Sequence, residues 1–236
     1  MATIRNAVSS SRTEVERTGE FFGKLSLEAF RDLASLQIPI SYSPNQILFS
    51  EKEATRGIFV VLEGEVKLSI NSAEGKRLSL SIARKGDILG LSSALSGGGY
   101  EMTAEVLYPA KIAPVERQDF LNFVGRHPEV YQILIAEMSR QYALACEQLR
   151  TVGLASTAPE KLARLLLDWS ESGQKTGSGV RFRFSLTHEE IGEFIGASRE
   201  TVTRTLSVFK TRQLVAFHGS MLTIPSRMAL EHYAHV

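Results

Sequence analysis

Seven consecutive residues in the C-terminal part of the chain combine side chains that can read the edges of base pairs. They are Ser198-Arg199-Glu200-Thr201-Val202-Thr203-Arg204. On a helix, positions 199, 200, 203 and 204 share one face near the N-terminal end, and positions 202 and 206 point inward. Arginine can donate a bidentate pair of hydrogen bonds to guanine, and a neighbouring glutamate can accept one from cytosine N4. We therefore expect a base-reading face for the major groove of DNA, made of Arg199, Glu200, Thr203 and Arg204.

Polar and basic side chains around the same helix suit contacts to phosphates. Ser198 and Thr201 lie at its positive N-terminal end, which itself attracts anions, and Lys210 lies near its other end. His218 lies in a short turn further along, where we interpret it as a phosphate contact and not as a catalytic base. The alternative is that all these residues are only the solvated surface of a capped helix and a turn.

Two short helices joined by a tight turn must position these residues. Thr187-His188-Glu189-Glu190 forms a capping box, in which the Thr187 side chain bonds the amide of Glu190 and the Glu190 side chain reaches back. Gly196 ends the first helix and Ser198 caps the second. Two strands, 214–217 and 221–224, follow around a short turn. This order predicts a winged helix-turn-helix.

The preceding part of the chain alternates between apolar and polar residues with period two from Ile38 to Glu116. One helix is predicted before it, over 21–36, from the spacing of its apolar residues. The clearest strands are predicted at 58–62, 66–70, 78–82, 103–107 and 111–115, with a turn at Glu63-Gly64 between the first two. Short strands at this spacing predict a small β-barrel or roll.

After Pro128 the apolar residues return to a helical period and alternate spacings of four and three. We expect this seam to join two copies of the chain in a homodimer. Its members are Tyr131, Ile135, Met138, Tyr142, Ala145, Leu149 and Val152. The alternative is a helix that packs only on its own β domain, through residues such as Ile133 and Leu134. Gly153 to Pro159 interrupts the helix and is interpreted as a hinge.

Composition limits the remaining function classes. Lys and Arg number 27 against 26 Asp and Glu, which gives a net charge of +1 and argues against purely electrostatic wrapping of nucleic acid or binding to an anionic membrane. The only cysteine, Cys146, excludes an intramolecular disulfide and indicates a reducing compartment. No apolar run approaches about 18 residues, and the N-terminal arm lacks the apolar core of a signal peptide. We expect a cytoplasmic protein without a membrane segment.

The C-terminal motifs resemble those of the CRP/FNR family of regulators. The resemblance rests on the run 190–206 and on Phe217-His218-Gly219, and the order of parts agrees over 21–236. It implies an α+β fold with an N-terminal double-stranded β-roll that resembles a jelly roll, a long dimerisation helix and a C-terminal winged helix-turn-helix. The expected domains are a flexible arm over 1–20, a sensory β-roll over 21–126, the dimerisation helix over 127–154 and the DNA-binding domain over 155–236.

The resemblance also implies roles for particular residues. Arg199, Glu200 and Arg204 would read bases in an inverted palindrome of the TGTGA type, and RNA polymerase would be a partner. The oxygen-sensing branch of the family has Ser at Thr203 and an aliphatic residue at Arg199, so the reading helix is more similar to the catabolite-activator branch. The residues implied to contact phosphates are Thr187, Ser198, Thr201 and His218.

The sensory half departs from the family pattern between Gly90 and Ala104, the region where an effector is expected. The family binds cAMP through a Gly-Glu pair and an Arg before Ser/Thr-Ala, whereas this chain has Gly90-Leu91 and Met102-Thr103-Ala104. A buried cyclic phosphate would lack a cation, so cAMP is not expected. An iron–sulfur cluster is excluded because the family's sensor needs four cysteines. A heme held by His127 or Met102 stays open, and the effector is unidentified.

Two motifs resemble parts of enzyme active sites but are incomplete. His188-Glu189-Glu190-Ile191-Gly192 begins like a zinc-protease motif but has Gly192 in place of the second ligand, and Gly97-Gly98-Gly99 lacks the Lys-Ser/Thr of a phosphate loop. An enzyme, or a metal site, is therefore not expected. The first remaining alternative is a β-roll module that acts through protein partners. The second is a constitutive DNA binder without an effector.

Overall fold

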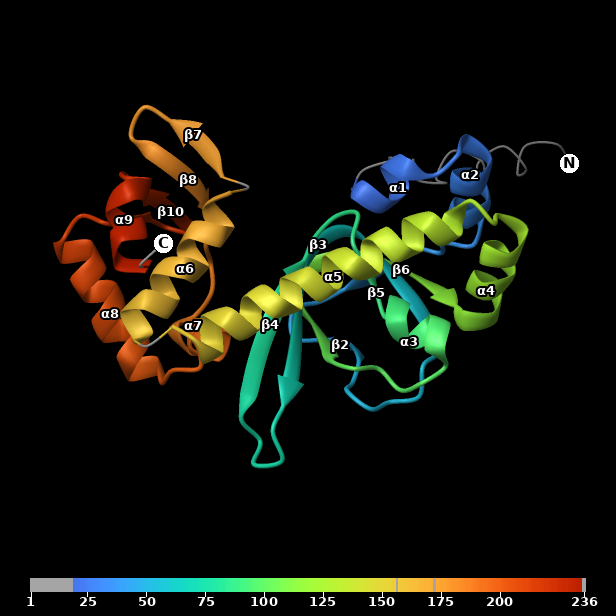
Figure 1. Ribbon diagram of the computed structural model, residues 1–236, viewed down its shortest axis with the longest axis horizontal. Coiled ribbons are helices and arrows are strands. Elements are labelled where there is room, and N and C mark those ends of the chain that lie inside the picture. Colours follow the sequence, from blue (N-terminus) through green and yellow to red (C-terminus); the bar gives the residue numbers. More distant parts are fainter. Residues whose placement is uncertain (1–18, 156, 172, 235–236) are drawn as a thin grey trace, which may run out of the picture. The chain divides into compact units, whose positions relative to one another are not determined.

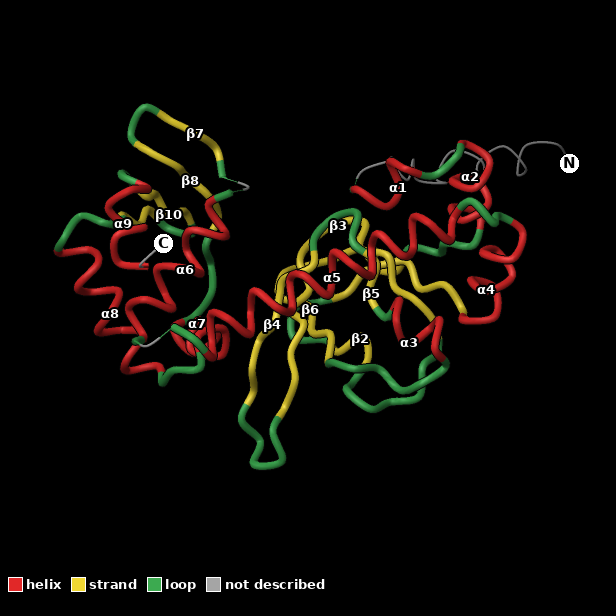
Figure 2. The backbone as a smooth tube through the Cα atoms, viewed as in Figure 1, coloured by secondary structure: helices red, strands yellow, loops and turns green. Residues whose placement is uncertain are grey.

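The computed structural model describes residues 19–155, 157–171 and 173–234. The described residues divide into two compact units, one within 19–68 and 82–141 and the other within 69–81 and 142–234. Figures 1 and 2 show the elements of each unit. Of the expected N-terminal arm over 1–20, only Gly19 and Glu20 lie within the described residues, and Glu20 begins a helix.

The β-roll is built on two long antiparallel strands, β3 (Gly57–Asn71) and β6 (Thr103–Glu116). Its six-stranded sheet has the order β1-β6-β3-β4, with β2 paired to β6 and β5 paired to β3. The shorter strands are β1 (Ile40–Tyr42), β2 (Ile47–Phe49), β4 (Arg77–Ala83) and β5 (Ile88–Leu89). The expected α+β fold with a β-roll is confirmed.

The expected turn at Glu63-Gly64 is wrong, because β3 continues through it. Gly64 has a φ of +87°, and a Cβ on it would lie 2.6 Å from Ala110 Cα in β6. The glycine therefore bends the strand where it passes β6 and does not reverse the chain. The segments 103–107 and 111–115 are likewise one strand. A period-two pattern interrupted by glycine does not distinguish a bend from a hairpin.

Two apolar clusters hold this unit together. Phe49, Phe59 and Tyr100 belong to the cluster inside the roll, where the Tyr100 and Phe49 rings stack with centroids 4.0 Å apart. The buried Tyr100 hydroxyl accepts from the Arg56 and Gly57 amides at 3.1 and 3.2 Å, and it donates to Gly57 O at 3.0 Å. The Tyr100 hydroxyl group is therefore fully bonded although it is buried. The second, helix-side cluster joins the helices of this unit to the sheet.

The helices of this unit differ from the predicted single helix over 21–36. That segment forms α1 (Glu20–Lys24) and α2 (Leu27–Ser35), because Ser26 accepts from the Ala29 amide at 3.1 Å and caps a new helix. Two further helices, which the periodicity did not reveal, are α3 (Leu91–Ser96) and α4 (Arg117–Arg126).

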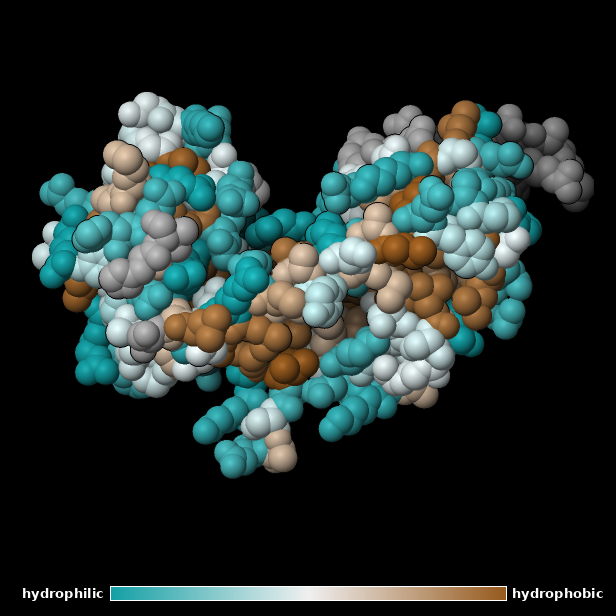
Figure 3. All heavy atoms as spheres, viewed as in Figure 1, coloured by the Kyte–Doolittle hydropathy of each residue, from teal (hydrophilic) through white to brown (hydrophobic). Residues whose placement is uncertain are grey.

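The long helix α5 (Val130–Gly153) begins in the first unit and ends in the second. Leu134 and Ile133 pack against the helix-side cluster of the β-roll. On the same helix, Arg140 forms ion pairs with Glu137 at 2.7 Å and with Asp87 at 3.2 Å. Partial burial raises the pKa of Asp87. Apolar side chains nevertheless lie exposed along α5 (Figure 3), among them Tyr131, Ile135, Met138, Tyr142, Leu144 and Leu149.

The C-terminal unit contains a four-stranded sheet of order β7-β8-β10-β9, and α6 packs both on this sheet and on the helices α7, α8 and α9. Trp169 lies in its core, with its ring centroid 5.2 Å from that of Phe184 and 5.3 Å from that of Phe194. The helices are α6 (Ala158–Ser170), α7 (His188–Ile195), α8 (Arg199–Thr211) and α9 (Arg227–Ala234). The strands are β7 (Gln174–Thr176), β8 (Gly179–Arg183), β9 (Ala216–His218) and β10 (Met221–Ile224). The expected winged helix-turn-helix is confirmed.

Candidate nucleic-acid interface

Local signals position α7 and α8 as the sequence predicted. The capping box is complete, since the Thr187 side chain accepts from the Glu190 amide and Glu190 Oε2 accepts from the Thr187 amide at 2.8 Å. Gly196 ends α7 in the left-handed region with φ +63°, and Ser198 accepts from the Thr201 amide at 3.3 Å. A Cβ on Gly192 would lie 2.5 Å from Ala197 O, so this glycine lets the turn close onto α7.

The α8 helix has one buried and one exposed side. Val202, Leu206 and Phe209 are at most 2% exposed, because they pack into the core of the unit. The side chains of the expected base-reading face are all exposed, and they are Arg199, Glu200, Thr203 and Arg204. The arrangement matches what insertion of the N-terminal turns of α8 into a major groove requires.

The surroundings of the Glu200 carboxyl group favour its ionised form. Hydrogen bonds from its own backbone N–H and from the Ser198 hydroxyl lower the Glu200 pKa, and the neighbouring charges of Arg199 and Arg204 add to the effect. The carboxylate therefore stays ionised throughout the neutral pH range. An ionised carboxylate only accepts, as a contact to the cytosine amino group requires.

Sequence reasoning missed His188 as a neighbour of the reading helix. His188 lies in the first turn of α7, and its Nδ1 is 2.7 Å from the Thr203 hydroxyl. Thr203 in turn donates to the Arg199 carbonyl at 2.9 Å. The capping-box motif indicated that His188 starts a helix, but nothing in the sequence placed it beside a residue 15 positions later.

The side chains of the expected phosphate contacts around α8 interact with neighbouring side chains of the protein. Thr187 donates its hydroxyl proton to Glu190 Oε2 at 2.9 Å, and Ser198 and Thr201 share a hydroxyl contact of 3.2 Å. Lys210 lies over the Phe217 ring, with Nζ 4.6 Å from the centroid. These contacts place the Thr187 hydroxyl at the start of α7, the Ser198 and Thr201 hydroxyls at the start of α8, and the Lys210 ammonium group against β9.

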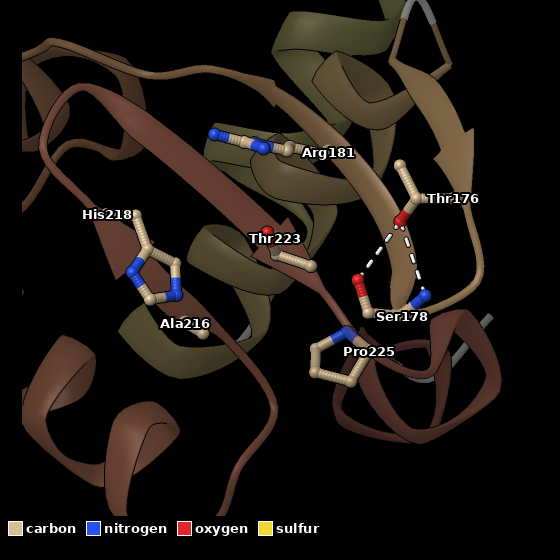
Figure 4. A pocket seen from close by; sticks show the side chains of 7 residues that line it. All are labelled: Thr176, Ser178, Arg181, Ala216, His218, Thr223 and Pro225. Atoms are coloured by element: carbon tan, nitrogen blue, oxygen red, sulfur yellow. Dashed lines mark hydrogen bonds between the residues drawn. The ribbon is translucent and has the colours of Figure 1, made fainter.

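His218 belongs to an open cleft of about 500 Å³ on one face of the wing sheet. Arg181 pairs with Thr223 and Thr223 pairs with Ala216, so the three side chains share that face. Figure 4 shows Thr223 between Arg181 and His218, with Thr176 and Ser178 bonded to each other at the rim. His218 ends β9 opposite Met221, next to the hairpin turn. Arg181, which lines the same cleft, adds a positive charge to this face.

Two residues that depart from the cAMP-binding pattern in the effector region, Leu91 and Met102, pack into the apolar clusters of the β-roll. Leu91 is 1% exposed in the helix-side cluster, and Met102 packs against the cluster inside the roll. The hydroxyl of Thr103 accepts from the Glu51 amide at 3.0 Å.

His127, which the sequence left open as a heme ligand, lies outside this region and is bonded to another side chain. Its Nε2 lies 2.9 Å from Asp32 Oδ2, and this hydrogen bond lowers the Asp32 pKa.

Two kinds of feature are absent from the described residues. Within 19–155, 157–171 and 173–234, no three His, Cys, Asp or Glu side chains gather as they would around a metal ion. The same part of the chain contains no helix long and apolar enough to cross a membrane.

Comparison with known sequences identifies both units. The family model of the Crp-like helix-turn-helix domain matches residues 160–233, and that of the cyclic nucleotide-binding domain matches 39–127. Together with the geometry of α7 and α8, these matches define a DNA-binding transcriptional regulator that carries a cyclic-nucleotide-binding domain.

Curated relatives agree with this class. The CRP-like cAMP-activated global transcriptional regulator of Mycobacterium tuberculosis is 24% identical over 88% of this chain and 92% of that protein. The transcriptional activatory protein AadR of Rhodopseudomonas palustris is 27% identical over 82% of this chain and 80% of its own length. The chain belongs to the CRP/FNR family of transcriptional regulators.

Solved structures share the fold. FixK2 from Bradyrhizobium japonicum superimposes with a TM-score of 0.74 at 23% identity, covering 84% of this chain and 96% of its own. A CooA mutant from Carboxydothermus hydrogenoformans gives a TM-score of 0.73 at 20% identity and covers 96% of each chain.

Proposed function

We propose that the chain acts as a homodimer that reads an inverted palindrome of the TGTGA type through α8. The observation that carries this proposal is the exposed set at the start of α8, where Arg199 and Arg204 flank an ionised Glu200. Guanidinium and carboxylate groups together suit a G·C-containing half-site. Lys210 and His218 would contact the phosphates on either side, and Thr187, Ser198 and Thr201 would do so once their hydroxyl protons turn from Glu190, from Glu200 and from each other to the phosphate oxygens.

The exposed side of α5 supports dimerisation. Six of the seven seam residues are exposed in the single chain, and the seventh, Val152, is half-buried. Most of the seven side chains are large and apolar, so their exposure is unfavourable in water. A second copy of the same helix would cover this stripe in a coiled coil, as a palindromic site requires. Leu134, on the other side of α5, is already buried against the β-roll.

The signal that controls the dimer is unidentified. Leu91 and Met102 occupy the effector region with apolar side chains, which supports a ligand other than cAMP despite the cAMP-activated relatives. His127 would have to leave Asp32 before it could bind a heme iron through Nε2. We propose that the signal alters α5 between Met138 and Val152, and that rotation near Gly153 then sets two α8 helices about 34 Å apart on DNA. A constitutive binder is the alternative.

We also propose a cytoplasmic location for the protein and RNA polymerase as a protein partner. A DNA-binding regulator acts where the chromosome is, which supports a cytoplasmic location. RNA polymerase is the proposed protein partner, since a regulator that activates transcription acts on the polymerase. The rival proposal is a module that acts through other proteins. The match of residues 160–233 to the Crp-like helix-turn-helix domain favours DNA.

Substitution of Arg199 tests the function. Arg199→Ala should weaken binding to a palindromic TGTGA-type duplex by about 1–3 kcal/mol and relax the preference at one base pair, measured by fluorescence anisotropy at fixed salt. Arg31→Ala, which removes an exposed arginine of the β-roll unit, should bind like the wild type. Equal affinity of the wild type for this duplex and for scrambled DNA would refute the proposed site.

A further inference from the structure

The hydroxyl group of Thr203 is committed within the protein. It donates its only proton to the Arg199 carbonyl at 2.9 Å, because a carbonyl oxygen can only accept. The contact of 2.7 Å with His188 must then use Nδ1–H as the donor. A threonine hydroxyl in this state has no proton for DNA and only one lone pair left, so it cannot donate to guanine O6 or N7, adenine N7 or thymine O4.

The two partners also orient the side chain. Threonine on a helix divides between rotamers, one of which bonds the carbonyl four residues earlier. His188, held by the first turn of α7, adds a second hydrogen bond to the same oxygen. Both bonds draw the oxygen toward the protein, while Thr203 as a whole stays exposed on the base-reading face. The methyl group is then the part of the side chain available to a base.

We propose that Thr203 reads a thymine through contact between its methyl group and the thymine C5-methyl group, and that His188 is the positioning residue that sets this orientation. Apolar contact with the thymine methyl group is the way in which a threonine methyl reads the major groove. The inference rests on the proposed function, since it requires α8 to lie in that groove. It assigns His188 a role in specificity that does not depend on contact with DNA.

Thymine-to-uracil exchange gives a direct readout, because uracil lacks only the C5-methyl group. Each thymine of the palindromic TGTGA-type duplex, on both strands, is replaced in turn by deoxyuridine, and binding is measured by fluorescence anisotropy. For the wild type, one position per half-site should show a loss of about threefold to fivefold per half-site contact, the effect of one buried methyl group.

Two variants separate the methyl group from the hydroxyl group. Thr203→Val keeps the methyl group and should retain both the affinity and the thymine-to-uracil ratio. Thr203→Ser keeps the hydroxyl group and should bind the thymine duplex as weakly as the uracil duplex, with a ratio near one. The reverse order, with Ser like the wild type and Val weakened, would show that the hydroxyl group contacts a base amino group and would overturn the inference.

Variants of His188 test the positioning role. His188→Leu should lower the thymine-to-uracil ratio toward one, because only the Arg199 carbonyl then favours one of the two helical rotamers of Thr203. His188→Asn places an amide N–H where Nδ1–H lies and should restore the ratio, which a merely structural residue would not do. Circular dichroism checks that both variants fold, and retention of the ratio in a folded His188→Leu would refute the role.

The outcomes distinguish this inference from the function on which it rests. Specific binding that Arg199→Ala weakens, but that is insensitive to uracil at every position, would overturn the Thr203 contact and leave the DNA-binding proposal intact. Absence of any preference over scrambled DNA would overturn both.

Discussion

The Ser79 hydroxyl donates a 2.9 Å hydrogen bond to Oε2 of Glu193, although 114 residues separate the two in the chain. Ser79 is fully buried in β4, and Glu193 belongs to α7. The Gln148 side chain in α5 adds two bonds at the same place, donating to Ser79 O at 2.9 Å and to Phe194 O at 2.8 Å. The end of the β3–β4 hairpin, the last part of α5 and the first helix of the helix-turn-helix are thus tied together within the C-terminal unit.

Replacement of Gln148 should destabilise this unit. Gln148→Leu leaves the Ser79 and Phe194 carbonyls without these donors, and both residues are buried, so the free energy of unfolding should fall by about 1–3 kcal/mol. Urea titration followed by fluorescence of Trp169, the only tryptophan, reports on this unit directly. Gln132→Leu changes an exposed glutamine of the same helix and is the control. Equal losses from both variants would contradict a specific role for Gln148.

Asp168 should make the stability of the C-terminal unit depend on pH. Partial burial of its carboxyl group, with the charges of Glu171 and Glu147, raises the Asp168 pKa to about 6. Since the folded state then binds the proton more tightly than the unfolded state, the contribution of Asp168 is most favourable below pH 4 and is lost as pH rises through 6.

Asp168→Asn removes the carboxyl group, and with it the unfavourable free energy of holding a charged carboxylate at this position above pH 6. At pH 8 the variant should be more stable than the wild type by about 1 kcal/mol, a value reduced for the solvent that reaches this partly exposed side chain. The difference should shrink as pH falls from 7 to 4 in thermal unfolding experiments. A difference that is constant over this range would show that the carboxyl group does not titrate as argued.

Met138 tests the expected seam on α5. Met138→Glu would place a charge in the centre of the dimer contact, where pairing with a second copy would bury it, so we expect monomers that no longer bind the palindrome. Light scattering after size-exclusion chromatography measures the mass. Met228→Glu adds the same charge at a methionine of α9 that is 78% exposed and should leave a dimer. A dimer that survives in Met138→Glu would exclude this seam.

The helix-turn-helix could be predicted because its signals are local. Thr187, Gly196 and Ser198 each act within one helical turn, so the boundaries of α7 and α8 follow from three or four neighbouring residues. The buried side of α8 followed in the same way, from the spacing of Val202 and Leu206.

Features that depend on distant residues could not be predicted. Whether Gly64 bends or reverses the chain is decided by its approach to Ala110, 46 positions later. The contact between His188 and Thr203 requires α7 and α8 to be packed already, and no period or cap encodes it. The split of the first helix at Ser26 was a local signal that the regular apolar spacing concealed.

The exposed side of α5 has a consequence for how the protein responds to its own abundance. If two chains meet there, the DNA-binding form is made by a second-order step, and at low copy number the amount of dimer grows with the square of the number of chains. Occupancy of a target site would then rise more steeply than synthesis of the protein. Dilution at cell division would by itself release DNA, so that the rate of expression becomes an input to the switch beside any small-molecule signal.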